Sequence, residues 1–240
     1  MASIFVAVPS YKGISDGEAQ RLCGADALRQ AGHTVSVAVL AGLCHLDIAR
    51  AELQALFIKS GHSHILWQDD DMAVDGPSIA HMFDLYDRRK LDVLLAPYKL
   101  RQANAPYGFV PTSIPDSDRL VECLWIALGC VIIRRDLILQ LMRSYEDLQF
   151  ESEIAPGMKA CGLFNSIVVD ACKYNRDLPE GARFCFGDDR AFSHRLREMG
   201  VVAHAYVDAK TNHRGLDGCF GKEIENRAPT GLVGPDGRLL

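Results

Sequence analysis

Short apolar runs alternate with helical segments through the first part of the chain, and this alternation most constrains the fold. The strand-like runs are apolar or β-branched and cover 3–8, 34–40, 63–67 and 91–96. The segments between them repeat apolar residues at helical spacing and cover 16–30, 45–59 and 77–89. Strands separated by helices join through right-handed crossovers. The sequence therefore predicts an α/β fold with a mostly parallel, Rossmann-like sheet flanked by helices.

The alternation breaks after Pro97. Residues 98–121 are rich in proline and predict an irregular connection with at most a short edge strand, and the pattern over 146–182 is mixed. The remaining segments predict a strand over 124–133, helices over 136–145 and 188–199, and a strand over 201–207. Residues 209–240 are rich in glycine and polar residues and predict a tail without regular structure. We expect one domain over 1–240.

Composition excludes several classes of protein. The formal net charge of −5 argues against nucleic-acid binding through the whole surface. No apolar run approaches the length of a membrane span, and the N-terminus lacks the basic region of a secretory signal. We therefore expect no membrane association and a cytoplasmic location (the host cytoplasm if the protein is viral). The eight cysteines include no CxxC pair, which favours reduced thiols over a structural zinc site.

The most informative segment is a run of three acids, Asp69, Asp70 and Asp71, directly after the apolar strand that ends at Trp67. Ligands of open α/β sheets bind outside the carboxyl ends of the strands. Adjacent carboxylates repel each other unless a cation neutralises them, and oxygen ligands suit Mg²⁺ or Mn²⁺. On an extended strand Asp69 and Asp71 would face the same way. A solvated turn leading into a helix cap remains the alternative.

Several motifs, in this order along the chain, resemble the glycosyltransferases of the GT-A fold, which bind a nucleotide-sugar and a divalent cation through an Asp-x-Asp motif. Val8-Pro9-Ser10-Tyr11 is similar to the opening strand that places the nucleotide. The helix with Ile48-Ala49-Arg50-Ala51 leads into the acid run as it does in viral and microbial members. Ala127–Arg135 resembles the strand beside the donor sugar, and Gly187-Asp188-Asp189 resembles the helix start that carries the base of inverting members.

The resemblance implies a role for each matched residue. It places the nucleotide-sugar at Pro9, Ser10, Tyr11, Arg50, Asp69, Asp70 and Gly129. It assigns a Mn²⁺ or Mg²⁺ ion to Asp71, Asp69 and His213, the last being similar to a terminal histidine that completes the metal shell. It makes 1–97 the nucleotide-binding half, 98–208 the acceptor half and 209–240 a tail.

The sequence departs from the family pattern in two places. Asp188-Asp189 replaces the usual Glu-Asp, and the alignment puts the base at Asp189 with Asp188 in support. The second strand ends at Leu40-Ala41-Gly42, without the acid that many members use for uracil, so both UDP- and GDP-sugars stay open as donors.

The residues themselves leave further alternatives open. Arg50 lies on or beside the apolar face of its helix and needs an anionic partner there, which is either a phosphate or a structural carboxylate. Asp188 and Asp189 are also compatible with a plain helix N-cap and first-turn acid, which the helix dipole favours.

We expect a metal-dependent glycosyltransferase, with inversion at the anomeric carbon. The alternatives are a nucleotidyltransferase on a similar sheet and a non-catalytic nucleotide- or carbohydrate-binding module. The acceptor is not specified, and a hydroxymethylated DNA base is one candidate because local basic residues occur at 88–90, 99, 101, 134–135, 195 and 197.

Overall fold

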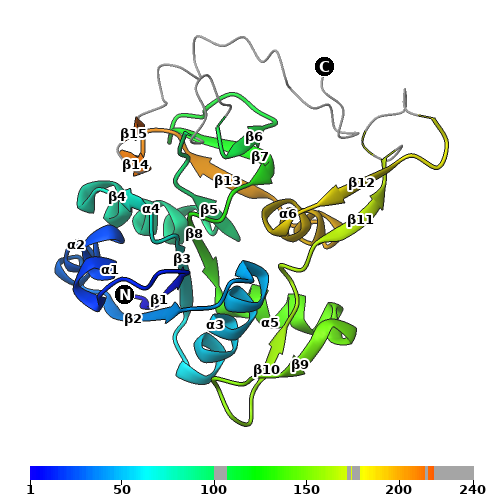
Figure 1. The fold of residues 1–240 in the computed structure, drawn as a ribbon. Coiled ribbons are helices and arrows are strands. Elements are labelled where there is room, and N and C mark those ends of the chain that lie inside the picture. Colours follow the sequence, from blue (N-terminus) through cyan, green and yellow to red (C-terminus); the bar gives the residue numbers. More distant parts are fainter. Residues whose placement is uncertain (100–106, 172–173, 175–178, 214–215, 219–240) are drawn as a thin grey trace.

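The fold is built on one large twisted sheet with helices on both faces (Figure 1). The computed structural model describes residues 1–99, 107–171, 174, 179–213 and 216–218. Its helices are α1 (Asp16–Leu22), α2 (Ala25–Gln30), α3 (Leu46–Ser60), α4 (Gly76–Arg89), α5 (Arg135–Ser144) and α6 (Asp188–Glu198), with a 3₁₀ turn η1 at Glu146–Leu148.

The strands fall into the central sheet and three small ones. The central sheet contains β1 (Ser3–Ser10), β2 (Thr34–Ala41), β3 (His64–Gln68), β5 (Val93–Leu95), β6 (Phe109–Pro111), β7 (Leu120–Ile126), β8 (Cys130–Arg134) and β13 (Ala203–Tyr206). The small sheets pair β9 (Gln149–Glu151) with β10 (Lys159–Cys161), β11 (Ile167–Asp170) with β12 (Arg183–Phe186), and β14 (Thr211–His213) with both β4 (Met72–Val74) and β15 (Leu216–Gly218).

The central sheet is eight-stranded, with the order β2-β1-β3-β8-β5-β13-β7-β6. β2, β1 and β3 are parallel, β8 lies antiparallel between β3 and β5, and β13 is parallel to β5. β7 is antiparallel to β13, and β6 is antiparallel to β7. Only β8 and β7 therefore run against the other strands of this sheet. The predicted α/β fold with a mostly parallel sheet is confirmed.

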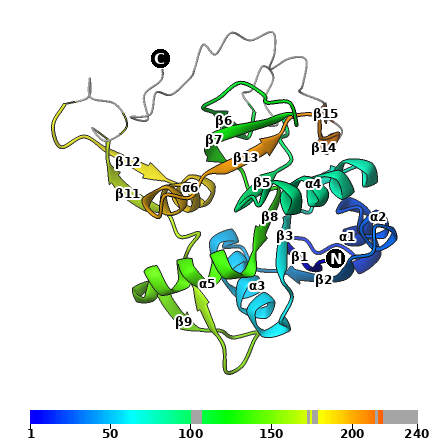
Figure 2. The same ribbon diagram turned by 180° about the vertical axis from the view of Figure 1, so that it is seen from behind.

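Alternate residues of the strands supply two separate cores. On β1, Phe5 and Ala7 pack with residues of α3, α5 and α6, whereas Ile4, Val6 and Val8 pack with residues of α1, α2 and α4. Figures 1 and 2 show the two sets of helices on opposite sides of the sheet. Burial on both faces explains why β1 reads as a continuous apolar run and not as an alternating one.

Two predicted elements are interrupted. The helix expected over 16–30 is split into α1 and α2 at Gly24, which has a φ of +61°. The strand expected over 124–133 is wrong in its middle, because β7 ends at Ile126 and β8 begins at Cys130. The amide of Ala127 donates to the carbonyl of Gly108 at 2.6 Å and that of Leu128 to the Asp189 carboxylate at 3.1 Å. These amides therefore hydrogen-bond outside a continuous strand ladder.

The expectation that no regular structure follows residue 209 is wrong for the residues that the structure describes there. β14 pairs antiparallel with β4, which follows the acid run, and β15 continues this small sheet. Such a pairing joins segments far apart in the chain, so local patterns do not indicate it. Residues 214–215 and 219–240 of the expected tail lie outside the described residues. Within the described part of the chain, no helix is long and apolar enough to cross a membrane.

Candidate functional site

The three consecutive acids form a turn at the carboxyl end of β3, which we call the acid turn (Asp69–Asp71). β3 ends at Gln68, and the amide of Met72 donates to the carbonyl of Asp69 at 3.2 Å as β4 begins. The alternation of an extended strand therefore does not apply to these three residues, although Asp69 and Asp71 line the same pocket. Each carboxylate has a different protein partner.

Asp70 connects the acid turn to the end of β1. The Ser10 hydroxyl donates to Asp70 Oδ2 at 2.5 Å and accepts the amide of Gly13 at 3.0 Å. Beside this contact lies a pocket of about 390 Å³. It is lined by Pro9, Ser10, Tyr11, Lys12, Leu43, Cys44, Leu46, Ala49 and the whole acid turn. The structure thus brings Pro9, Ser10 and Tyr11 together with the acids.

Asp69 pairs with Arg50 of α3. The Nη2 atom of Arg50 lies 2.8 Å from Asp69 Oδ1, and Nε lies 3.7 Å from Asp188 Oδ2 at the start of α6. The Arg50 side chain is only 1% exposed, and its guanidinium also lies over the Trp67 ring. The anionic partner that this buried arginine required is therefore carboxylate. Arg50 does not line the pocket described above.

Asp189 lies in the first turn of α6, where it is half-buried and its charge acts on the Arg50 guanidinium. One oxygen accepts the amide of Leu128 at 3.1 Å. Burial, followed by the charge of Asp188, raises the pKa of Asp189 to about 7. The charge of Asp69 also raises this pKa, and Arg50 opposes the shift. Gly187, not Asp188, is the N-cap of α6, and it makes no side-chain cap hydrogen bond.

Tyr98 is a residue of this site that sequence reasoning missed. It follows β5 and is buried, and burial together with the charges of Asp69 and Asp189 raises the pKa of its hydroxyl well above the usual value. The Tyr98 ring explains why residue 129 is a glycine, because a Cβ there would lie 2.7 Å from the ring. The Gly129 carbonyl in turn accepts the amide of Asp69 at 2.9 Å. The available signal was its position just after a strand of the parallel set.

Asp71 faces His213 of β14. The distance between Asp71 Oδ2 and His213 Nε2 is 3.7 Å, and both side chains are largely buried. His213 Nδ1 lies 2.6 Å from the carbonyl oxygen of Lys99. A carbonyl only accepts, so Nδ1 carries the hydrogen, and in the neutral ring the lone pair of Nε2 is directed away from Lys99.

This pair fits the donor set of a divalent cation. A cation about 2.1 Å from each ligand atom fits between atoms up to about 4.2 Å apart. The Nδ1 hydrogen bond to a backbone carbonyl is the usual support of a metal-binding imidazole. Within the described ranges no group of three or more His, Cys, Asp or Glu side chains could hold a metal ion. Phosphate oxygens or waters would have to complete the shell, as is common for Mg²⁺.

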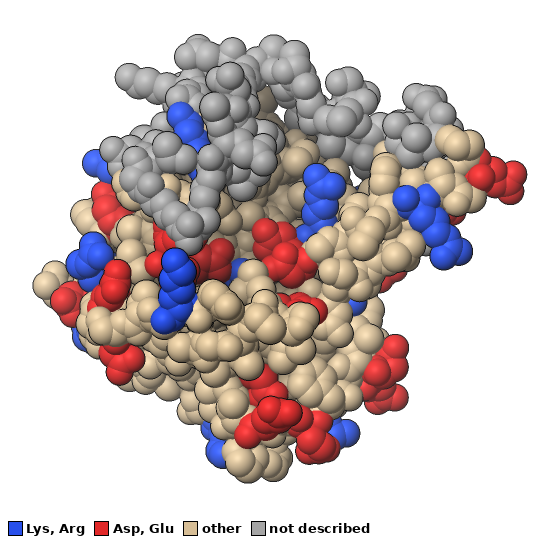
Figure 3. All heavy atoms as spheres, in the orientation of Figure 1, with Lys and Arg blue, Asp and Glu red and all other residues tan. Residues whose placement is uncertain are grey.

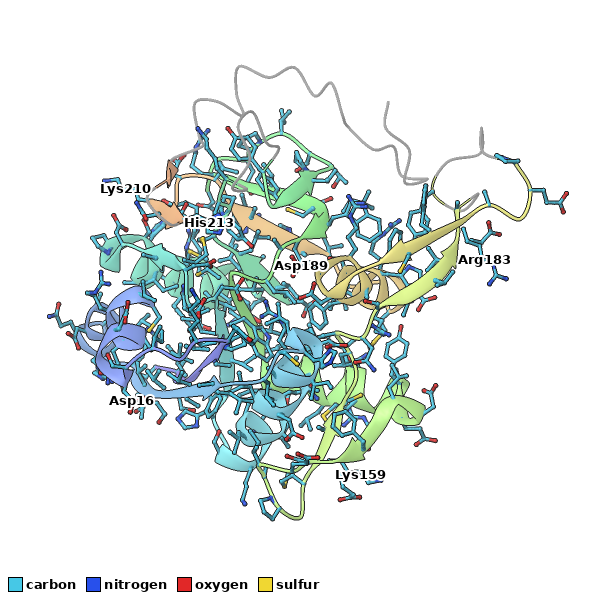
Figure 4. The ribbon with its side chains drawn as sticks, viewed as in Figure 1. Asp16, Lys159, Arg183, Asp189, Lys210 and His213 are labelled. Carbon is cyan, nitrogen blue, oxygen red and sulfur yellow. The ribbon has the colours of Figure 1, made fainter. Side chains whose placement is uncertain are left out.

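The sequence-predicted residues come from elements far apart in the chain but lie around one central region. In Figure 4, His213 on β14 and Asp189 at the start of α6 lie toward the middle of the molecule, whereas Asp16, Lys159 and Arg183 lie at its periphery. Figure 3 shows acidic side chains gathered near the centre of this face. The surplus of carboxylates makes this region electronegative and suited to cations.

Comparison with solved structures identifies the fold. The A197 protein from STIV is 15% identical, with a TM-score of 0.50 over 89% of this chain and 85% of that one. UDP-glucose pyrophosphorylase, solved as a complex with UDP-glucose, is 9% identical, with a TM-score of 0.51 over 90% of this chain and 94% of that one. No protein-family model matches the sequence, and the search of curated proteins finds no match. At these identities the likeness shows a shared α/β fold.

Proposed function

We propose that the chain is a divalent-cation-dependent glycosyltransferase of the GT-A kind, which transfers a sugar from a UDP- or GDP-sugar to an acceptor hydroxyl with inversion. One observation carries the proposal. The pKa of the half-buried Asp189 is raised to about 7, and this carboxyl is electrostatically coupled to Arg50 and to Asp69 of the acid turn, which lines a nucleotide-sized pocket. A residue with such a pKa is suited to general acid–base chemistry near neutral pH.

The pocket beside the acid turn would hold the nucleoside. Leu43, Leu46 and Ala49 give it an apolar wall, and Tyr11, which is 68% exposed, offers a ring at its edge. Ser10 holds Asp70 in place beneath it. An apolar wall with a few fixed polar groups is the usual construction of a ligand pocket.

Asp71 and His213 would hold the Mn²⁺ or Mg²⁺ ion, which would supply positive charge to the leaving diphosphate. Their separation of 3.7 Å and the fixed imidazole tautomer support this assignment. Asp69 is directed to Arg50 and would act by holding the turn. It would not bind the metal ion directly.

Asp189 would take the proton from the acceptor hydroxyl. An inverting transfer needs such a base on the face of the sugar opposite the leaving group. Arg50 pairs with Asp69 of the acid turn and lies near Asp188 of α6. It would therefore fix the position of the donor site relative to the acceptor site. Asp188, within 3.7 Å of Arg50, would support the base electrostatically.

Two other functions share this fold and these acids. A nucleotidyltransferase often has a glycine-rich, basic loop after the first strand, whereas the segment after β1 is Tyr11-Lys12-Gly13. A non-catalytic nucleotide- or sugar-binding module would have no use for a carboxyl tuned to near-neutral pKa. The raised pKa of Asp189 therefore favours the glycosyltransferase over both alternatives.

The acceptor side gives little support to a DNA substrate. Arg88 and Arg89 pair with Asp118, and Arg134 pairs with Asp92. Arg135 and Arg195 donate to backbone carbonyls, and Arg195 is buried. These basic residues already serve the fold, and Arg101 lies outside the described residues. A hydroxymethylated base stays in the acceptor screen as one candidate among small sugars and glycosides.

The test is a panel of UDP- and GDP-sugars with Mn²⁺ or Mg²⁺, read as release of the nucleoside diphosphate with and without acceptors. The proposal predicts metal-dependent release of the nucleoside diphosphate from one donor class. The rate of this release should be lower in Asp189→Asn than in wild type. Incorporation of a nucleoside monophosphate into a sugar phosphate would instead identify a nucleotidyltransferase. Nucleotide binding without any turnover across the panel would favour the binding module.

A further inference from the structure

A second pocket of about 520 Å³ adjoins the first at the acid turn. Lys12, Asp70 and Asp71 line both pockets. The rest of its wall comes from the segment after β1, from α1 and from the small sheet, namely Gly13, Ile14, Arg21, Leu22, Ala73 and Asn212. The second pocket is the larger of the two, and the proposed donor site does not account for it.

The charges of the second pocket are of two kinds. Asp70 already accepts the Ser10 hydroxyl, and Asp71 faces His213. Lys12 and Arg21 make no ion pair or side-chain hydrogen bond with any residue that the structure describes. Both are exposed at the rim. The groups that remain available to a ligand are therefore an ammonium and a guanidinium.

Lys12 borders both pockets, and Arg21 borders only the second. A nucleotide with its base in the first pocket and its phosphates beside the acid turn would bring its outer phosphates to these two cations. A guanidinium binds two phosphate oxygens at once, and an ammonium serves as a point charge beside them. A cation held by Asp71 and His213 would offset the repulsion from the acids.

We propose that this second pocket, with Lys12 and Arg21 as its anion ligands, binds a pyrophosphate group, either as the terminal phosphates of a nucleoside triphosphate or as free pyrophosphate. The proposal goes beyond the glycosyltransferase function, which requires only a diphosphate bonded to a sugar. A nucleoside triphosphate bound across both pockets would compete with the sugar donor.

The experiment is calorimetric titration of the full chain with inorganic pyrophosphate, with and without Mg²⁺. We expect wild type to bind, and Lys12→Ala, Arg21→Ala and the double variant to lose at least about tenfold in affinity, the usual weight of one charge-assisted hydrogen bond. The matched control is Arg29→Ala combined with Lys59→Ala, which removes the same charge from α2 and α3 outside the pocket. This control is expected to bind like wild type.

Titration with UMP, UDP and UTP separates the two sources of the pyrophosphate group. Wild-type affinity should rise from UMP to UTP, and Arg21→Ala should leave UMP binding unchanged while losing the gain from UDP to UTP. Equal pyrophosphate affinity in wild type and the double variant, or an equal loss in the control, would overturn the proposal while leaving the donor site intact. Pyrophosphate binding that needs Lys12 and Arg21, in a chain that binds no nucleotide-sugar, would support this pocket and refute the proposed function.

Discussion

Arg50 Nη2 lies 2.8 Å from Asp69 Oδ1, and this ion pair joins α3 to the turn after β3. The same guanidinium lies 3.7 Å from Asp188, so one buried cation serves carboxylates from both sides of the site. Since the surrounding acids outnumber it, the cluster holds excess negative charge that burial makes costly. Burial, together with the charges of Asp188 and Asp69, raises the pKa of Asp189, and Arg50 opposes this shift. The site geometry therefore depends on Arg50.

Replacing Arg50 by methionine keeps the unbranched apolar stem of the side chain but leaves Asp69 and Asp188 without their cation. We expect a loss of about 3 kcal/mol in the free energy of unfolding, as for other half-broken buried ion pairs. Urea unfolding near neutral pH measures it. The double variant Arg50→Met with Asp69→Asn should recover part of the loss, because one uncompensated charge is removed with the partner. Additive losses in this cycle would show that the pair makes no energetic contribution.

The ionisation of Asp189 should make stability depend on pH. Its pKa in the fold is about 7, above the ordinary value near 4, so between these limits the folded state holds a proton that the unfolded state releases. The unfolding free energy therefore falls as pH rises through this window. Asp189→Asn cannot ionise, and its stability relative to wild type should increase from about pH 4 to about pH 7 by up to about 4 kcal/mol.

Unfolding curves at both ends of that pH range measure this difference. Asp84→Asn, at an exposed position of α4, is the matched control and should show no comparable trend. A pH-independent difference between Asp189→Asn and wild type would mean that this carboxyl titrates at its ordinary pKa.

Gly129→Ala should damage the acid turn through Tyr98. The new Cβ would lie 2.7 Å from the Tyr98 ring, so one of the two must move, and we expect a loss of about 1–3 kcal/mol in unfolding free energy. Because the Gly129 carbonyl holds the amide of Asp69, nucleotide affinity should fall as well. Gly17→Ala is the control: its Cβ meets nothing within 4 Å, and in helix α1 it should be neutral or slightly stabilising. Equal thermal stability of Gly129→Ala and wild type would contradict this packing.

The proposed cation site is tested by Asp71→Asn and His213→Gln. Each should lower Mn²⁺-dependent binding of UDP or GDP by at least about tenfold, the usual effect of disturbing a metal shell. His213 is only 8% exposed on its side chain, bonds to Lys99 and contacts the Tyr98 ring, so its variant should also lose thermal stability. Metal-independent nucleotide binding by wild type, unchanged in Asp71→Asn, would show that Asp71 and His213 hold no cation for the nucleotide.

The sequence predicted the fold well where elements are local and strongly patterned. The apolar β1 and the helix α3 were predicted to within a few residues, because burial on defined faces leaves a clear period. The connection between β7 and β8 was not predicted, because the amides of Ala127 and Leu128 hydrogen-bond to groups distant in the chain. β14 was missed for the same reason: its partner β4 lies far away in the sequence.

The candidate site was predictable as a set of residues but not as a set of pairs. Motif order indicated Asp69, Asp71, Arg50 and Asp189, and the structure brings them to one region. Which carboxylate meets Arg50 and which meets His213 depends on the turn after Gln68, and a strand pattern does not predict that turn. Tyr98 carries no motif and emerges only from its packing on Gly129.

Whether Asp189 is the catalytic base is decided by comparing Asp189→Asn with wild type during sugar transfer from the donor identified by the nucleotide-sugar panel, with the product anomer assigned by NMR. We expect an inverted anomeric carbon, donor affinity like wild type, and turnover lowered by about 10²–10⁴, the usual weight of general base catalysis. Retention of configuration, or an Asp189→Asn variant that turns over like wild type, would contradict this role and leave Asp189 as a structural acid of α6.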